Sequence, residues 1–285
     1  MTSAVFQTFP APAKLNLLLH IVGKRADGYH LLETVFRFID LNDTVSLALR
    51  DDGDVVLETP ISGVDPEQDL TVRAARLLQQ HAACGLGVSI RLEKKIPMGG
   101  GLGGGSSDAA TVLLALNRMW RLNLPRAELQ ELGLKLGADV PVFIFGRSAL
   151  ATGVGEKLNE IKLKPAWYVV IHPQVHVPTS KIFQNFSQEV LTEVGVVGIM
   201  RILETTQRRR NDLQNVVSNM YPAVNEVLTE LRKYGSPLMT GSGSCVFLEC
   251  QSKDEADKVY QAVSIKYKGF LAKGLDVHPL IDSAE

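Results

Sequence analysis

Six of the seven residues from Gly99 to Gly105 are glycines, and this run constrains the chain more than any other feature of the sequence. Glycine accepts positive φ angles and lets the backbone approach a ligand with no Cβ in the way, so successive N–H groups can converge on one anion. Because so many adjacent glycines cost conformational entropy, a purely structural turn is the less favoured alternative. The run therefore predicts a phosphate-binding loop.

The residues on either side of the run predict a strand before it and a helix after it. Polar and apolar residues alternate from 88 to 93, which indicates a half-buried strand, and Pro97 ends its regular pairing. Apolar residues then recur at helical spacing from 109 to 120. Three residue types that cap helices stand at the expected start, namely Ser106, Ser107 and Asp108. Such a helix N-terminus would present free N–H groups and a positive dipole end to phosphate, with Asp108 as a partner of that dipole.

Two common nucleotide-binding motifs do not account for the run. Gly99, Gly101 and Gly104 satisfy the G-x-G-x-x-G spacing, but residues 118–125 do not supply the second apolar strand, ending in an acidic residue, that a dinucleotide fold requires. No Gly-Lys-Ser or Gly-Lys-Thr closes the run, as it would in a P-loop. A dehydrogenase is therefore the weaker alternative.

Four other short segments stand with the glycine run in a fixed order along the chain: PAKLNL at 12–17, RADGYH at 25–30, LGADVPV at 136–142 and TGSGSC at 240–245. The segment from Pro97 to Ala110 resembles the phosphate loop of the GHMP kinases, the superfamily of galactokinase, homoserine kinase and mevalonate kinase. The other segments are similar to motifs of the branch that phosphorylates a cytidine-diphosphate-linked methylerythritol. The resemblance spans positions 12 to 245 and so covers most of the chain.

The resemblance implies an enzyme that transfers the γ-phosphoryl group of ATP to the 2-hydroxyl of that substrate, in the non-mevalonate route to isoprenoid precursors. It implies an α+β fold of two domains, ribosomal-S5-like over residues 1–155 and ferredoxin-like over residues 156–285. Mg2+ is the expected counter-ion of ATP, and no metal site made by the protein is predicted. The residues expected to hold the nucleotide are Pro97, Met98, Gly99, Gly100, Gly101, Leu102, Gly103, Gly104, Gly105, Ser106 and Ser107, with Ser107 as a possible contact of the metal or phosphate.

Phosphoryl transfer also needs an acceptor for the hydroxyl proton and positive charge near the transferred group. Asp139 is the candidate for the first role because it lies between a glycine helix stop and Pro141, although from local sequence it could equally cap the next helical turn. Lys14 is the candidate for the second, although strand alternation alone would turn Lys14 and Asn16 to solvent. The resemblance implies instead that Lys14 faces the site and pairs with Asp139.

A cytidylyl substrate also requires residues that recognise the base. Tyr29 and His30 follow a predicted turn at Asp27-Gly28 and could provide a stacking ring and an edge hydrogen bond. The resemblance places Phe183 on the opposite face of the base, although its helical position is equally typical of a core residue. Asn16 and Thr179 are secondary candidates for polar contacts with the substrate.

The composition is that of an ordinary globular protein and excludes several functions. Thirty basic and thirty-one acidic residues among 285 give a formal charge of −1, so neither a nucleic acid nor an anionic membrane is an expected partner. No long apolar segment or basic leader stands at the start, which predicts a cytoplasmic protein. The three cysteines, Cys84, Cys245 and Cys250, are too few and too scattered for a disulfide framework or a zinc cluster.

Periodicity predicts further elements around these motifs. Strands are expected at 14–21, 33–41, 44–49, 54–58 and 167–171, around Gly241 and near Val277, and helices at 70–81, 126–136, 188–208, 221–234 and from Ser252. A domain boundary is expected in the Gly-rich and polar stretch 152–165. Arg208 to Arg210 is expected to be a solvated helix end, and His172 and His176 to be loop residues.

Two other functions remain open at this stage. A different GHMP kinase, acting on homoserine or phosphomevalonate, would share the loop but would need no cytosine pocket. A nucleotide-binding regulator without turnover would also keep the loop, but it would have no use for Lys14 and Asp139.

Overall fold

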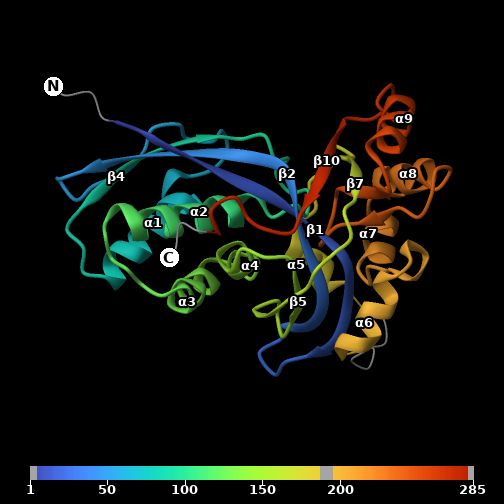
Figure 1. Ribbon diagram of the computed structural model, residues 1–285, viewed down its shortest axis with the longest axis horizontal. Coiled ribbons are helices and arrows are strands. Elements are labelled where there is room, and N and C mark those ends of the chain that lie inside the picture. Colours follow the sequence, from blue (N-terminus) through green and yellow to red (C-terminus); the bar gives the residue numbers. More distant parts are fainter. Residues whose placement is uncertain (1–4, 187–194, 282–285) are drawn as a thin grey trace.

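The computed structural model describes residues 5–186 and 195–281 and places a large mixed sheet through the middle of the molecule (Figure 1). Its strands are β1 (Gln7–Lys24), β2 (His30–Arg50), β3 (Val55–Leu57), β4 (Gly87–Glu93), β5 (Ala149–Thr152), β6 (Lys157–Glu160), β7 (Trp167–Ile171), β8 (Leu238–Met239), β9 (Val246–Cys250) and β10 (Gly269–Leu275). The helices are α1 (Leu70–His81), α2 (Gly104–Met119), α3 (Arg126–Leu136), α4 (Val140–Phe145), α5 (Thr179–Gln184), α6 (Gly195–Leu203), α7 (Gln214–Met220), α8 (Pro222–Leu231) and α9 (Lys253–Val263), with short 3-10 helices η1 (Pro66–Gln68) and η2 (Thr206–Arg208). This mixture confirms the predicted α+β class.

Two long antiparallel strands, β1 and β2, connect the two halves of the molecule, as the blue ribbons of Figure 1 show. The strand order is β3-β4-β2-β10-β7-β9-β8, with β1 and β5 also paired to β2 and β6 paired to β5. The two strands predicted at 33–41 and 44–49 are one strand, because β2 continues through a bulge. The register passes from Pro12 opposite Asn42 to Ala13 opposite Ile39, which leaves residues 40 and 41 unpaired with β1. A bulge bends a strand without ending it, which alternation alone cannot show.

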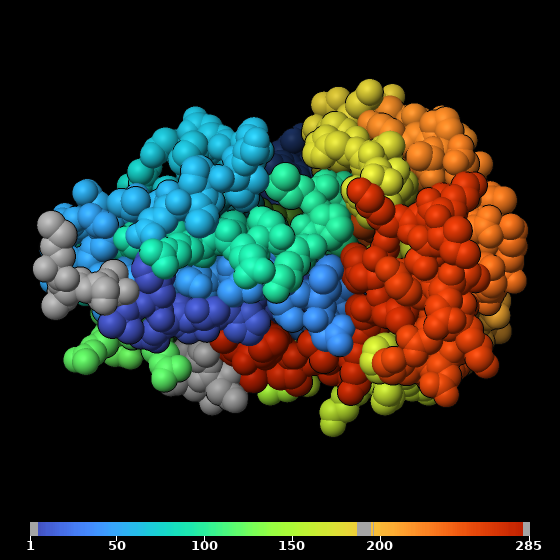
Figure 2. All heavy atoms as spheres, turned by 90° about the horizontal axis from the view of Figure 1, so that it is seen from above, coloured from blue at the N-terminus to red at the C-terminus, as the bar shows by residue number. Residues whose placement is uncertain are grey.

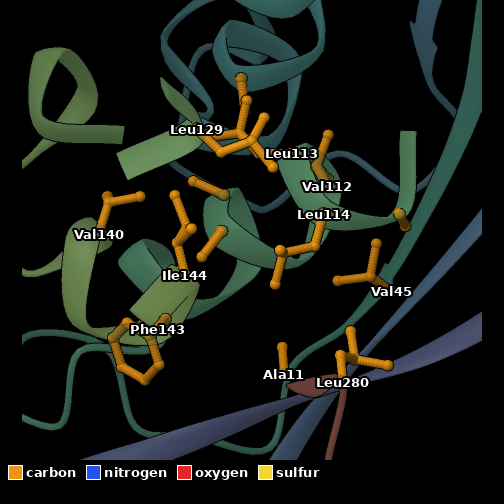
Figure 3. Close-up of a cluster of buried hydrophobic side chains, with 14 of the residues drawn as sticks. Ala11, Val45, Val112, Leu113, Leu114, Leu129, Val140, Phe143, Ile144 and Leu280 are labelled. Atoms are coloured by element: carbon orange, nitrogen blue, oxygen red, sulfur yellow. The ribbon is translucent and has the colours of Figure 1, made fainter. Parts of the chain in front are cut away.

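Helix α2, which follows the glycine run, lies at the centre of the N-terminal half. It packs against β1 and β2 on one side and against α1, α3 and α4 on the other. Figure 3 shows its Val112, Leu113 and Leu114 among side chains of α3, α4 and both long strands. Every residue from 107 to 117 is buried, so the helix is enclosed rather than amphipathic as its spacing predicts. A central buried helix holds the loop before it on a rigid base.

The C-terminal half follows the predicted elements closely. β7 has the predicted bounds, α8 lies within the predicted range, and Ser252 caps α9 by accepting the N–H of Glu255 at 3.2 Å. The single helix predicted at 188–208 is wrong in its described part, because α6 ends at Leu203 and η2 begins only at Thr206; residues 188–194 lie outside the described residues. Two elements of this half were not predicted: helix α7, and strand β6 inside the stretch taken as a boundary. The strand predicted near Val277 is β10, which already ends at Leu275.

His278 is a buried histidine whose titration should destabilise the fold in acid. Its ring meets Phe38 and Phe143 edge-on and accepts the N–H of Leu280 at Nδ1, 3.0 Å away. Burial, assisted by Arg126, lowers the pKa of His278 to about 3. Because the folded state binds this proton more weakly than the unfolded chain, stability is complete at neutral pH and is lost as pH falls below about 6.5. By pH ~5 the free energy of unfolding should have fallen by about 2 kcal/mol from its value at neutral pH.

Denaturant unfolding of wild type and H278N at pH 7 and 5 measures this contribution. Asparagine keeps an acceptor for the Leu280 N–H but does not titrate. Between pH 7 and pH 5, the free energy of unfolding of the variant should therefore fall by about 2 kcal/mol less than that of wild type. Equal losses in both proteins would show that His278 is not responsible.

Among the residues that the structure describes, the helices are all too short or too polar to cross a lipid bilayer.

Candidate active site

The glycine run forms a loop between the end of β4 and the start of α2, at the junction of the two halves. The helix starts at Gly104, and its N-cap residue is Gly103, with no side chain that accepts a hydrogen bond from the first turn. The prediction that Ser106, Ser107 and Asp108 cap the helix is therefore wrong, because all three lie within its first turns. An uncapped helix start keeps its first N–H groups available to an anion.

The backbone of the loop alternates between two conformations. Gly99, Gly101 and Gly103 have φ angles of 68°, 74° and 73°, while positive values are absent at the described residues 100 and 102 between them. Such alternation turns successive N–H groups toward one side and forms an anion-binding concavity. Three of the glycines are thus required by their φ angles.

The carbonyl groups of the same loop are held by the surrounding protein. Those of Gly99 and Gly100 accept the N–H groups of Ser244 and Cys245, at 3.3 and 3.0 Å. The Gly101 carbonyl accepts Lys14 Nζ at 3.1 Å and Thr240 Oγ1 at 3.3 Å, and the Leu102 carbonyl accepts the Lys14 N–H at 2.9 Å. With four consecutive carbonyls bound to protein, the N–H edges of these peptides are left for a ligand.

Close packing explains why side chains are absent from the loop. A Cβ at Gly101 would overlap the carbonyl oxygen of Thr240, and one at Gly100 would lie 2.7 Å from Cys245 Sγ. A Cβ at Gly103 would lie 2.9 Å from the Phe143 ring and 3.0 Å from Lys14 Cε. The loop thus sits between strand β1 and the TGSGSC segment, which come from opposite ends of the chain.

Lys14 and Asp139 meet beside this loop. Lys14 Nζ lies 3.1 Å from Asp139 Oδ2, and the lysine is only 2% exposed whereas the aspartate is 36% exposed. Alternation predicts that Lys14 faces solvent, and this is wrong because the loop and the C-terminal half cover that face of β1. Asp139 precedes α4 at the N-cap position, but its side chain makes no capping hydrogen bond. Its carboxylate is directed to the lysine and to the pocket.

Asn16 is placed to orient Lys14. Its Oδ1 accepts Lys14 Nζ at 2.6 Å, and its Nδ2 donates to Thr34 Oγ1 at 2.8 Å. Its backbone N–H donates to Thr240 Oγ1 at 2.9 Å. Most of the polar groups of Asn16 are therefore used within the protein, although the residue lines the pocket. Thr34 and Thr240 were not predicted as site residues, and only the TGSGSC motif pointed to Thr240.

The residues expected to recognise a base gather at the other end of the site. The rings of His30 and Phe183 stack with centroids 5.2 Å apart and an angle of 28° between their planes. Tyr29 is 63% exposed, and Thr179 Oγ1 lies 2.7 Å from Ser242 Oγ. Partial burial, with a smaller contribution from Lys24, lowers the pKa of His30, so its ring is neutral at pH 7. Phe183 also packs against the C-terminal hydrophobic core. It is therefore at once a core residue, as its helical position suggests, and a residue of the pocket lining.

One pocket of about 930 Å³ joins these groups. Figure 2 shows the surface hollowed between the cyan part of the N-terminal half and the yellow segment of the C-terminal half. The predicted residues that line it are Lys14, Asn16, Tyr29, His30, Met98, Gly99, Gly100, Gly101, Leu102, Gly103, Gly104, Gly105, Ser106, Asp139, Thr179 and Phe183. Residues from distant parts of the chain thus share one cavity.

Two predicted nucleotide contacts do not line this pocket, Pro97 and Ser107. Ser107 is fully buried, and its Oγ has no hydrogen-bond partner. Its burial gives no support to the predicted contact with phosphate or metal, which stays a prediction. Among the described residues, no three His, Cys, Asp or Glu side chains gather where they could hold a metal ion.

Several charged and histidine side chains that were given no role in the reaction have defined contacts in the structure. Arg209 is not solvated, because it is 10% exposed and pairs with Glu249 at 2.5 Å. His172 and His176 are loop residues as predicted, and both approach the phosphate loop, at Gly100 and Gly99 respectively. Asp108, predicted to be a partner of the helix dipole, is buried near the start of α2 and paired with Lys94.

Comparison with known proteins agrees with this geometry. The family models of the GHMP kinase N-terminal and C-terminal domains match residues 69–147 and 197–269. The 4-diphosphocytidyl-2-C-methyl-D-erythritol kinase of Chromobacterium violaceum is 76% identical over 98% of this chain and 99% of its own length. That of Thiobacillus denitrificans is 56% identical over 97% of this chain and 98% of its own.

Solved structures give the same result. A crystal structure of 4-(cytidine 5'-diphospho)-2C-methyl-D-erythritol kinase is 35% identical, covers 94% of this chain and 99% of its own, and superposes with a TM-score of 0.82. A mevalonate kinase of L. major, 17% identical with a TM-score of 0.68 over 98% of this chain and 99% of its own, shares the fold. The chain therefore belongs to the 4-diphosphocytidyl-2-C-methyl-D-erythritol kinase family of the GHMP kinases.

Proposed function

We propose that this chain transfers the γ-phosphoryl group of ATP to the 2-hydroxyl of 4-diphosphocytidyl-2-C-methyl-D-erythritol, giving the 2-phosphate and ADP. One observation carries the proposal: Lys14 Nζ bonds both the Gly101 carbonyl of the phosphate loop and the Asp139 carboxylate. That contact sets a proton acceptor and a fixed positive charge against the loop whose N–H groups remain free. Phosphoryl transfer depends on such positioning and charge more than on covalent chemistry.

Each group has a role that follows from its position. The N–H groups of residues 99–106 hold the phosphates, assisted by the positive end of α2. Lys14 stabilises the charge that develops on the transferred group, and Asn16 keeps its ammonium in place. Asp139 accepts the hydrogen bond of the substrate hydroxyl and takes its proton as the new P–O bond forms.

The residues fit nucleotide phosphates, because the alternating φ angles of the loop gather N–H groups on one side while its carbonyls are bound to protein. Mg2+, when bound with the nucleotide, would supply further neutralisation of phosphate charge. We infer that it enters with ATP, as the counter-ion of the nucleotide phosphates.

An ADP-release assay with purified protein tests the assignment directly. The cytidylyl alcohol, homoserine and mevalonate are compared as acceptors at equal concentration, with CMP as competitor. We expect ADP release with the cytidylyl alcohol only, at a kcat/KM at least about 100-fold above the others, and inhibition by CMP. Equal activity with the three alcohols would overturn the assignment, and activity with homoserine alone would identify a different GHMP kinase.

Phe183 should contribute to the binding of the cytidylyl group. Stacking on an aromatic ring is worth about 1–3 kcal/mol, so F183A should raise KM for the cytidylyl substrate about 5- to 150-fold and leave KM for ATP unchanged. The matched control is F186A, because Phe186 meets His30 edge-on at 5.9 Å but does not line the pocket. Steady-state kinetics on both variants decide the point. Equal effects on KM in the two variants would assign Phe183 to packing alone.

A further inference from the structure

A buried ionic cluster beneath the phosphate loop has no part in the reaction described above. Lys94, which follows β4, donates from Nζ to Asp43 of β2 and to Asp108 of α2, the latter at 2.6 Å. The lysine side chain is 19% exposed, and the two carboxylate side chains are 0% and 3% exposed. These three residues come from three elements and are here called the strap.

The strap connects the two ends of the phosphate loop. Asp43 Oδ1 accepts the backbone N–H groups of Lys95 and Ile96, at 2.6 and 2.8 Å, immediately before the loop begins. Asp108 lies in the helix that begins as the loop ends. Lys94 bridges the two carboxylates, so the entry and the exit of the loop are held to each other and to β2.

Such a cluster is costly to bury, and stability alone does not explain it. Two carboxylates share one ammonium, and Asp108 Oδ1 is buried with no hydrogen-bond partner. Burial, opposed by Lys94 and reinforced by Asp43, raises the pKa of Asp108 to about 7. Replacing a buried ion pair by apolar residues is often neutral or stabilising, so a polar cluster here would be kept for the geometry that it imposes.

We propose that Asp43, Lys94 and Asp108 are positioning residues that fix the shape of the phosphate loop and thereby set the affinity for ATP. The inference rests on the proposed function only in taking the loop as the ATP site. It does not place Lys94 in contact with the nucleotide. Lys94 and Asp108 line the pocket, but each is committed to the strap.

Nucleotide binding by K94M and D108L tests the proposal. Calorimetric titration with a non-hydrolysable ATP analogue should show Kd raised at least about tenfold in each variant, because misplacement of binding groups by ~1 Å is enough for such losses. D108N should retain more affinity than D108L, since the asparagine oxygen still accepts from Lys94. The control is K95M, because Lys95 is the adjacent lysine, is 55% exposed and pairs only with the exposed Glu93 among the ion pairs of the described residues. Its Kd should stay within about twofold of wild type.

D108L separates the strap from direct contact of Lys94 with the nucleotide. Were Lys94 a phosphate ligand, removal of Asp108 would free its ammonium and remove a nearby negative charge, so the analogue would bind more tightly. Tighter or unchanged binding of the analogue by D108L would overturn the proposal. An equal rise in KM for ATP and for the cytidylyl substrate would also overturn it, because it would indicate a general structural defect. D108L leaves the Lys94–Asp43 pair intact and carries the test should K94M fail to fold. Analogue binding by wild type without kinase activity would count against the proposed function and not against the strap.

Discussion

Lys14→Met and Asp139→Asn should each lower kcat by about 100- to 10,000-fold while the affinity for ATP changes little. Methionine fills the space of the buried lysine stem but has no charge to place near the transferred phosphoryl group. Asparagine keeps the shape of Asp139 but cannot take the proton of the hydroxyl. Nucleotide binding should persist, because the proposed site holds the phosphates with backbone N–H groups rather than with either side chain. Single-turnover kinetics and calorimetric titration of the nucleotide measure the two properties separately.

The control for this pair is Lys253→Met, which breaks an exposed ion pair of similar length, 2.7 Å, on α9. Its kcat should remain within about twofold of wild type, since exposed pairs of this kind contribute little. The double variant K14M/D139N should lose little more than either single variant, because residues that act as a unit are not additive. Retention of kcat in both single variants would remove Lys14 and Asp139 from the mechanism.

Gly101→Ala should abolish nucleotide binding. The residue has φ 74°, a conformation that costs a non-glycine residue about 1–2 kcal/mol, and its new Cβ would overlap the Thr240 carbonyl oxygen. Neither strain can be relieved by a side-chain rotation, because the obstruction is backbone. The loop must then move away from the TGSGSC segment and lose the alternating conformation that gathers its N–H groups. We expect Kd for the ATP analogue to rise at least about 100-fold.

Gly105→Ala is the matched control within the same run. Gly105 lies in the first turn of α2, its φ is not positive, and a Cβ there would meet only Leu70 Cδ1, at 3.3 Å. Alanine is also a better helix former than glycine. The variant should therefore fold, with a melting temperature near that of wild type, and bind the analogue within about tenfold of it. A similar loss of affinity for the analogue in the two variants would show that the run tolerates a side chain at neither position. The backbone conformation at Gly101 would then not explain the loss.

The local elements follow from the sequence because local physics determines them. Helix 70–81 has its predicted bounds because Asp69 caps its start, accepting the Thr71 N–H at 2.8 Å. Helix 126–136 begins after Pro125 and ends at Gly137, as the two residue types favour. The conformation of the glycine run follows from the sequence for a similar reason, since the positive φ angles that it adopts are open chiefly to glycine.

The environments of individual side chains could not be predicted in this way. Alternation along β1 correctly assigns Lys14 and Asn16 to one face of the strand, but it cannot show that the loop and the C-terminal half cover that face. For Ser107, a place near a helix start predicts contact with phosphate or metal, but it cannot show that the surrounding elements bury this side chain outside the pocket. Burial is set by elements that arrive from elsewhere in the chain, and no local pattern records it.

The sequence by itself determined the loop, the helix behind it, the α+β class and the residue types that phosphoryl transfer needs. Only the tertiary structure decided that Lys14 reaches Asp139 across more than a hundred residues, and that Asn16 and the Gly101 carbonyl hold the lysine in place. It also decided that Lys94 bonds carboxylates at both ends of the loop. The physical reason is that backbone conformation depends on neighbouring residues, whereas the meeting of charged side chains depends on how sheets and helices pack.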